Sequence, residues 1–422
     1  MIKKIIFTTD FLFHSENDKG TYHFWTVKLF ATIIESVTGI KIEELKNLGF
    51  SRDEFYRLSG ILNTESRYYT YDISKITKES VSYLKSFIDK ETLVICVELG
   101  IDLRNILNNL GVNFINFWFH SYKLFDDTLL MINTNNCEIF KLLNNYKVPQ
   151  EQFYFYANYW QTRIIRDKTF NDSFLEDNSA VFIAQTYKDK SVEKDKKFLN
   201  ILDYKDEIEN LSKKYNKIYY IAHPLCPIND EIKDYINAKR YLIELTDFPT
   251  YFLLASNKIK EVISISSSVL YEAQFFNKKI NYLYKPLFNI DGEFGLNTFI
   301  SVYNDYFNPS FWSSVLAPVT QTGSEVLNRN LFFNHKNKLR DAANSYMGYK
   351  FLSPVKQLET TVNELDAALK LQKTHISQLQ KSIDKLNAIK YNVYPKHLIQ
   401  LLSCFIFDIT KRKAFRKKYS RI

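Results

Sequence analysis

The sequence predicts an α/β protein of two Rossmann-like domains, extended by a coiled-coil helix and a basic amphipathic tail. Three observations lead to this prediction. Short apolar runs alternate with helical stretches between residues 1 and 290, a pattern typical of mostly parallel sheets with helices between the strands. An apolar heptad pattern follows Pro354, and basic residues concentrate at the end of the chain.

The size and composition of the chain allow two full hydrophobic cores. It has 422 residues, of which 45% are hydrophobic and 16% aromatic, and a chain of this length normally forms more than one domain. Its four cysteines are scattered without a C-x-x-C spacing, at positions 96, 137, 226 and 404. Neither a disulfide framework nor a zinc site is therefore indicated, and we expect a cytoplasmic protein.

The first predicted domain spans residues 1–195. Its opening segment places two lysines before a short apolar run that ends at Asp10, which favours a first β-strand over a signal peptide. Further strands and helices are expected in alternation, with strands at 93–97, 114–117 and 181–184 and helices at 22–36 and 102–110.

The second predicted domain spans residues 196–350. Its expected strands are the apolar runs Lys217–Ile221, Val262–Ile265 and Ile280–Leu283. Ligands of such folds bind beyond the carboxyl ends of the strands. The chain contains no G-x-G-x-x-G and no Walker motif, so nothing indicates that it binds a dinucleotide or ATP.

A heptad pattern predicts a coiled coil over residues 351–390. Apolar residues recur at alternating steps of three and four from Val355 to Leu386, with Gln372 as the one polar position. The alternative is one long helix that packs back on the body of the protein. We favour self-association into a homo-oligomer, because the flanking positions are polar and offer no second apolar face.

Residues 391–422 predict a segment that lies on a membrane surface. They hold eight basic residues against Asp408 alone, within a chain whose formal net charge is +9. The apolar residues around Phe405 are too few to span a bilayer, and such a segment suits the headgroup region of an anionic leaflet. We expect residues 396–422 to make this contact; a solvated basic tail is the alternative. The rest of the chain is nearly neutral, so nucleic acid is not an expected partner.

Two strand ends in the second domain carry groups suited to a phosphate. His223 and Pro224 follow one strand, and Ser266, Ser267 and Ser268 follow another at the point where a helix would begin. Hydroxyl and backbone N–H groups at a helix N-terminus bind anions. We expect the serines to hold the phosphate or carboxylate of a sugar donor, and Glu272 to hold ribose hydroxyls. Taken alone, the serines indicate only a helix cap.

Two further strand ends carry candidate catalytic carboxylates. Asp189 follows the strand at 181–184 and is a candidate nucleophile or base, with a helix-capping aspartate as the alternative. Glu98 ends the strand at 93–97 and precedes a predicted helix, so a catalytic role and a helix N-terminal role are equally supported.

Several segments, in their order along roughly residues 90–290, resemble the retaining β-Kdo transferases of bacterial capsule and lipopolysaccharide synthesis. The donor of that family is CMP-Kdo, the cytidylate of 3-deoxy-D-manno-oct-2-ulosonic acid. The matching stretches are Val97–Arg104, Gly111–His120 with Asp126 and Asp127, Gln185–Ser191, His223–Pro224 and Ser266–Ala273. The ordered set is more specific than any single member.

The resemblance implies a GT-B-like fold in which the CMP moiety is held by His223, the three serines and Glu272. It places Gln185, Thr186 and Ser191 on the donor side as well, and His120, Asp126 and Asp127 on the acceptor side. It further implies a double displacement, in which Asp189 forms a glycosyl-enzyme intermediate and a second carboxylate serves the acceptor. Glu98 is the candidate for that second role.

We therefore expect a peripheral enzyme on the inner face of the cytoplasmic membrane, which transfers β-Kdo to a lipid-linked O-antigen or capsule glycan. No metal or other cofactor is expected, because no D-x-D element is positioned to hold a nucleotide-bound cation. One alternative is a sialyltransferase or another CMP-sugar transferase, because bacterial sialyltransferases also use a His-Pro element and serines. The other alternative is a coiled-coil scaffold of a polysaccharide assembly complex.

Overall fold

The computed structural model describes most of the chain. The described residues are 1–12, 22–60, 76–187, 189–195, 197–224, 226, 228–246, 248–320, 354–392 and 396–419. The chain divides into two compact units, Met1–Gly348 and Tyr349–Ile422. Each unit is described by itself.

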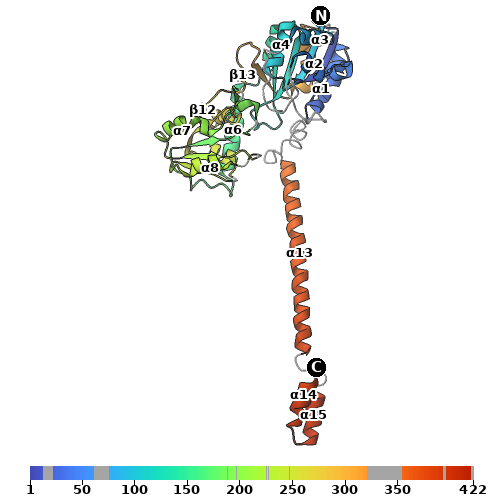
Figure 1. The fold of residues 1–422 in the computed structure, drawn as a ribbon, viewed down its shortest axis with the longest axis vertical. Helices are drawn as coiled ribbons and strands as arrows, with labels where there is room; N and C mark the ends of the chain where they lie inside the picture. The colour runs from blue at the N-terminus through green and yellow to red at the C-terminus, as the bar shows by residue number, and fades with distance from the viewer. Residues whose placement is uncertain are drawn as a thin grey trace. The chain divides into compact units, whose positions relative to one another are not determined.

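A seven-stranded sheet forms one half of the first unit (Figure 1). Its strand order is β13-β14-β5-β4-β3-β1-β2. Strands β1 to β4 pair in parallel, whereas β5 is antiparallel to both of its neighbours. The strands are β1 (Lys4–Thr9), β2 (Ile42–Glu44), β3 (Thr92–Val97), β4 (Asn113–Phe119), β5 (Leu130–Thr134), β13 (Asn289–Ile290) and β14 (Thr298–Val302).

A five-stranded sheet, entirely parallel, forms the other half of the first unit. Its order is β10-β9-β6-β11-β12. The strands are β6 (Ser179–Ile183), β9 (Ile218–Ile221), β10 (Leu242–Glu244), β11 (Ile259–Ser264) and β12 (Lys279–Tyr282), and a small hairpin of β7 (Glu193–Lys194) and β8 (Lys197–Phe198) follows β6. The prediction of an α/β protein with two mostly parallel sheets is confirmed.

Helices connect the strands, and several begin at residues that cap them. Ser51, Thr77, Asn136 and Asn229 each accept a hydrogen bond from a backbone N–H of the first turn, which satisfies a donor that the helix leaves unpaired. The helices are α1 (Tyr22–Thr38), α2 (Arg52–Leu58), α3 (Lys78–Lys85), α4 (Ile101–Leu110), α5 (Cys137–Asn144), α6 (Gln150–Ile165), α7 (Lys205–Ser212), α8 (Asp230–Asn237), α9 (Thr250–Ala255), α10 (Val269–Ala273) and α11 (Pro309–Leu316).

The sheets divide the chain at other places than the predicted boundary at residue 195. Strand β6 was expected in the first domain but pairs with β9 and β11 of the second sheet. Strands β13 and β14 fall in the predicted second domain, yet β14 pairs with β5 of the first sheet. The chain therefore leaves the first sheet before β6 and returns to it after β12.

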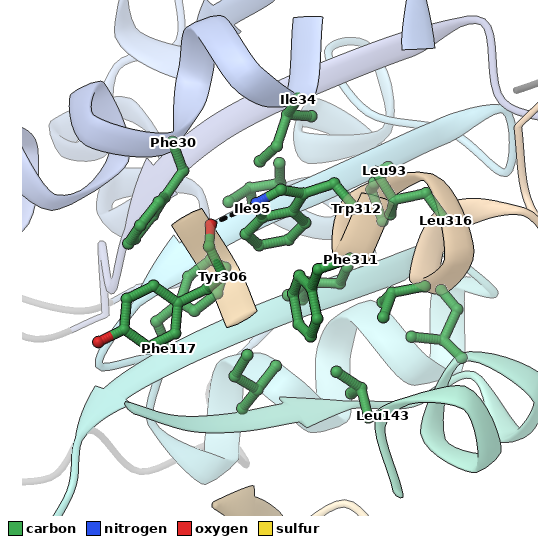
Figure 2. Packing of buried hydrophobic residues seen from close by; sticks show 14 of the residues in the cluster. Phe30, Ile34, Leu93, Ile95, Phe117, Leu143, Tyr306, Phe311, Trp312 and Leu316 are labelled. Carbon is green, nitrogen blue, oxygen red and sulfur yellow. Dashed lines mark hydrogen bonds between the residues drawn. The ribbon is translucent and has the colours of Figure 1, made fainter. Parts of the chain in front are cut away.

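The returning segment is anchored in the core of the first sheet. Figure 2 shows Trp312 of α11 among Phe30 and Ile34 of α1 and Ile95 of β3. All four side chains are almost completely buried, and the indole Nε1 of Trp312 donates to the backbone oxygen of Tyr306 at 2.8 Å. Burying such large apolar side chains is the main favourable contribution to folding, so residues from both ends of the first unit stabilise this core.

The second unit consists of helices. Helix α13 (Pro354–Asn392) is drawn as one uninterrupted helix in Figure 1, and α14 (Lys396–Cys404) and α15 (Ile409–Tyr419) follow it. The apolar heptad side chains between residues 361 and 385 are about half exposed or more, so the coiled coil stays a prediction. Among the described residues, no helix has the length and apolar character that crossing a bilayer requires.

Candidate functional site

The carboxyl ends of three neighbouring strands bring most of the predicted donor-side residues together. Strand β6 lies between β9 and β11, and all three run parallel. The loops that leave them therefore emerge at one edge of the sheet. The loop after β6 carries residues 185–191, the one after β9 carries His223, and the one after β11 carries Ser266–Ser268.

The side chain of Gln185 links two of these loops. Its Oε1 accepts the backbone N–H of Ser266 at 2.8 Å, and its Nε2 donates to the Oγ of Ser191 at 2.9 Å. The hydroxyl of Ser266 donates to the backbone oxygen of Ser191 at 2.5 Å. Ser266 and Ser191 are both buried, so these three residues position the loops, and the donor groups of Ser266 are already occupied.

Asp189 lies in the same loop as Gln185 and Ser191. It is exposed, and both of its carboxylate oxygens accept hydrogen bonds. Its Oδ1 accepts the backbone N–H of Ser191 at 2.7 Å, and its Oδ2 accepts the hydroxyl of Thr186 at 3.2 Å. Two such bonds fix the orientation of the carboxylate while its face stays open to solvent. The bond from Ser191, together with the backbone bond from Val192 to the oxygen of Asp189 at 3.1 Å, is that of an aspartate capping the short helix Lys190–Val192. The structure thus has the capping contacts that the alternative predicts, and it leaves the carboxylate exposed as the catalytic role would also require.

His223 lies half-buried at the end of β9. Burial lowers the pKa of its imidazole, and the nearby Asp189 carboxylate opposes that shift by raising it. The imidazole and the carboxylate, from neighbouring strand ends, are therefore close enough to interact electrostatically. Pro224 follows it and is exposed, and the backbone oxygen of His223 accepts the N–H of Cys226 at 2.9 Å.

The serine run opens a helix, as predicted, but α10 has only five residues. The Oγ of Ser267 accepts the backbone N–H of Val269 at 3.3 Å, so Ser267 supplies the cap. Ser268 is exposed at the N-cap position, and its side chain makes no capping bond. Ser267 is buried like Ser266, so Ser268 is the exposed residue of the run.

Glu272 does not fit the predicted ribose contact. It is only 2% exposed, and its Oε1 accepts the backbone N–H of Lys123 at 2.7 Å. The hydroxyl of Tyr251 donates to Oε1 at 3.1 Å and to Oε2 at 3.0 Å. The carboxylate therefore ties the loop after β4 to α10 and does not point toward solvent. The position of Glu272 early in an apolar helix did not distinguish a contact to ribose from a structural contact inside the protein.

His120 does not fit the predicted acceptor-side role either. It is completely buried, its Nδ1 accepts the backbone N–H of Tyr122 at 2.8 Å, and its Nε2 lies 2.9 Å from the Oγ of Ser301. Ser301 in turn donates to Asp291 at 2.8 Å. Burial, helped by the charge of Lys123, holds the pKa of His120 well below its usual value. The neutral imidazole therefore joins β4 to β14.

The two neighbouring aspartates differ from each other. Asp127 is completely buried, and its Oδ1 accepts the backbone N–H of Thr128 at 2.7 Å. Asp126 is exposed, and its Oδ2 accepts the hydroxyl of Tyr156 at 3.3 Å. Of the two, only Asp126 is open to solvent. Among the described residues, no group of His, Cys, Asp and Glu side chains is arranged to hold a metal ion.

Glu98 lies at the carboxyl edge of the other sheet, in an unusual backbone conformation. Its φ of 55° falls in the left-handed region, which a residue with a Cβ adopts at an energetic cost. The turn is held by Asp10, whose Oδ2 accepts the N–H of Gly100 at 2.9 Å, and by Asn116, whose Oδ1 accepts the N–H of Leu99 at 2.9 Å. Such strain is common at functional sites.

Sequence reasoning missed several residues that position the site. Asp10 and Asn116 fix the Glu98 turn, and Tyr251 holds Glu272. Ser264 donates from Oγ to the backbone oxygen of Ile183 at 2.6 Å and so joins the ends of β11 and β6. Its spacing of two from Ser266 was the available signal, because residues i and i+2 of a strand share a face.

The basic C-terminal segment forms a helical hairpin in which α14 and α15 lie side by side (Figure 1). The Nε of Arg416 donates to the Oγ of the buried Ser403 at 2.7 Å. Between the helices the chain exposes Phe405 by 72% and Phe407 by 93%. Exposed basic residues follow along α15, namely Lys411, Lys413, Arg416, Lys417 and Lys418. Apolar and cationic groups are therefore exposed on one hairpin.

Comparison with known proteins finds similar solved structures at low sequence identity. No protein-family profile and no curated protein sequence matches the chain. Two solved structures of KpsC from Thermosulfurimonas dismutans are similar: a β-Kdo 2,7 transferase (11% identity, TM-score 0.39, 74% of this chain and 90% of that chain) and a β-Kdo 2,4 transferase (12% identity, TM-score 0.30, 52% of this chain and 78% of that chain).

A further similar structure is a UDP-GlcNAc 2-epimerase from Neisseria meningitidis bound to UDP-GlcNAc, with 13% identity and a TM-score of 0.27 over 66% of this chain and 82% of that chain. All three TM-scores lie below 0.5, so these likenesses carry no inference about the activity of this chain.

Proposed function

We propose that the chain is a retaining glycosyltransferase that takes β-Kdo from CMP-Kdo and transfers it to a lipid-linked bacterial surface glycan. One observation carries the proposal. The carboxylate of Asp189 is exposed, held by two hydrogen bonds and electrostatically coupled to His223 at the edge where three parallel strands end. The choice of CMP-Kdo rests on the resemblance of the ordered sequence segments to the β-Kdo transferases.

In the first step, an oxygen of the Asp189 carboxylate attacks the anomeric carbon of the sugar. The bond from that carbon to the phosphate oxygen breaks, and its electron pair leaves with CMP. His223, Ser267 and Ser268 are proposed to hold the departing phosphate. A neutral imidazole, which the lowered pKa of His223 provides near neutral pH, donates one N–H to such a group.

In the second step, an acceptor hydroxyl attacks the glycosyl-enzyme at the same carbon. Glu98 is proposed to take the proton of that hydroxyl, and the bond to Asp189 breaks, which restores the free carboxylate. Two successive inversions leave the configuration of the sugar unchanged. Gln185, Ser191 and Thr186 act as positioning residues, because they hold the Asp189 loop.

The C-terminal hairpin supports a membrane-bound acceptor. Its exposed Phe405 and Phe407 suit the apolar side of a headgroup layer, and the lysines of α15 suit anionic phospholipids. We propose that the hairpin holds the enzyme on the inner face of the cytoplasmic membrane. A lipid-linked glycan there would meet the enzyme at a high effective concentration.

The release of CMP tests this proposal. The purified chain is incubated separately with CMP-Kdo and with CMP-sialic acid, where water takes the place of the acceptor hydroxyl in the second step, and the free CMP is measured over time. We expect turnover with CMP-Kdo, and a loss of about 10³-fold or more in Asp189→Asn, the scale on which removing a reacting group acts. Asp195→Asn is the matched control, because Asp195 is an exposed aspartate six residues away in the same connection.

Three outcomes would overturn parts of the proposal. Turnover of CMP-sialic acid but not of CMP-Kdo would show that the donor is CMP-sialic acid. Equal rates of CMP release by Asp189→Asn and by the unchanged chain would show that Asp189 is not the nucleophile. If a folded protein released CMP from neither donor, the scaffold alternative would be favoured. Deleting residues 355–390 should then abolish function, whereas changing Asp189 should not.

A further inference from the structure

Helix α13 exposes an apolar seam between residues 361 and 385. Written as heptads, its a positions include Val362, Ile376 and Ile383, and its d positions include Leu365 and Leu379. These five side chains are about half exposed or more. A helix of 39 residues is about 58 Å long at 1.5 Å per residue. Such a helix is stabilised mainly by packing of its apolar face.

We infer that α13 pairs with α13 of a second copy of this chain as a parallel, in-register, two-stranded coiled coil. The residue types at the seam favour two strands. Three of the four a positions from Val362 to Ile383 are β-branched, and the apolar d positions are leucine. β-branched residues at a combined with leucine at d favour parallel dimers over larger bundles.

Gln372 selects the direction and the register of the pair. It occupies a d position, and it is the one polar residue of the seam. In a parallel, in-register pair each d residue faces its own counterpart, so the two Gln372 side chains meet. Each amide is both a donor and an acceptor, so the two can hydrogen-bond to each other.

Every other arrangement leaves Gln372 against an apolar side chain. In an antiparallel pair a d residue faces an a residue, and all a positions from Val355 to Ile383 are apolar. In a parallel pair shifted by one heptad it faces Leu365 or Leu379. A buried amide without a partner is costly, so these arrangements are disfavoured.

The positions that flank the seam are compatible with the parallel pair. In this register the g residues of one helix lie beside the e residues of the other, which pairs Thr361 with Asp366, Ala368 with Lys373, and His375 with Gln380. None of these pairs brings two like charges together. The flanking Asp366 also forms an ion pair within its own helix, with Lys370 at 2.9 Å.

The parallel direction has a consequence for the hairpin of α14 and α15. Both copies of α13 end at the same end of the coiled coil, and α14 begins four residues after Asn392. The two hairpins, with their exposed phenylalanines and lysines, would therefore both be attached at the same end of the coiled coil. Two linked membrane contacts bind more tightly than one.

Cysteine cross-linking of the full chain tests the direction of the pair. The exposed Cys137 and Cys404 are first changed to serine. Leu379→Cys, at a d position, should then give a covalent dimer on mild oxidation, because a disulfide needs Cα atoms close together. Gln378→Cys, one position earlier and outside the seam, should remain uncross-linked.

An equimolar mixture of Val362→Cys and Leu379→Cys distinguishes the antiparallel pair. In that pair residue 362 faces residue 379, so the mixture would cross-link while each variant alone would not, and the inference would be wrong. A molar mass equal to one chain of 50.0 kDa at all concentrations tested would also overturn it. In a Gln372→Leu background, we expect cross-links of both kinds, because the residue that selects the register is gone.

Discussion

At the scale of single residues, the site divides into side chains that hold one another and side chains that stay available. Gln185, Ser191 and Ser266 use their polar groups on each other, whereas Asp189 and Ser268 remain exposed. Sequence reasoning placed all five at the site, because polar residues at strand ends are recognisable. It did not separate the two groups, because burial depends on loops that meet from distant parts of the chain.

Replacing Gln185 by alanine tests the positioning role. The change removes the acceptor of the buried Ser266 N–H and the donor to Ser191, and an unpaired buried group costs about 1–3 kcal/mol. We expect the free energy of unfolding to fall by this amount, and kcat to fall more than KM rises, since Ser191 orients Asp189. Gln152→Ala on the exposed face of α6 should change stability by less than about 0.5 kcal/mol. Equal effects of the two changes would contradict this role.

His120 should make stability depend on pH. Its pKa is lowered well below the usual value in the folded chain, so the unfolded chain takes up the proton first as the pH falls. Stability is therefore fully present above about pH 6.5 and decreases below it by about 1.4 kcal/mol per pH unit. His223, whose pKa is also lowered, acts in the same direction.

Urea unfolding at pH 7.5 and at pH 5.5 measures this dependence. In His120→Asn, an amide oxygen replaces Nδ1 as the acceptor for Tyr122 without a titrating group. The variant should lose less stability between the two pH values than the unchanged chain. The same loss in both proteins would show that His120 does not titrate as its burial requires.

At the scale of elements, long and regular patterns were predicted better than short ones. The helix at 102–110 and the strand at 93–97 are found as α4 and β3, because each is a complete apolar pattern. Strands β5 and β14 were missed, although both are buried along their whole length. Their polar residues, such as Asn133 and Ser301, interrupt the apolar run but are satisfied inside the protein.

The hairpin makes a prediction at this scale. Phe407 is 93% exposed, so Phe407→Ser should leave the stability of the chain unchanged. Its binding to vesicles rich in anionic phospholipid should weaken by about 10-fold or more, since burying a phenylalanine contributes about 1.5–3 kcal/mol. Co-sedimentation with the vesicles measures this. Phe155→Ser, an equally drastic change of an exposed phenylalanine on α6, should not alter binding, and an equal loss there would contradict the hairpin as the contact.

At the scale of the whole molecule, the two sheets were predictable and their boundary was not. Apolar runs predict strands, but they do not predict which sheet a strand joins. The return of β14 and α11 to the first sheet depends on contacts of Trp312 with Phe30, which lie far apart along the chain. The donor-side loops still lie at one sheet edge despite the changed boundary, because β6, β9 and β11 all belong to the second sheet.

Intact mass spectrometry after mixing the chain with CMP-Kdo, without acceptor, detects whether Asp189 forms a covalent bond to the sugar. We expect the mass of one Kdo residue to be added covalently to the chain and to be absent in Asp189→Asn. Without acceptor only water can release the sugar, so the added mass should last longer in Glu98→Gln, which removes the proposed base of the second step. CMP release without any added mass, or an added mass that persists in Asp189→Asn, would show that Asp189 is not the nucleophile.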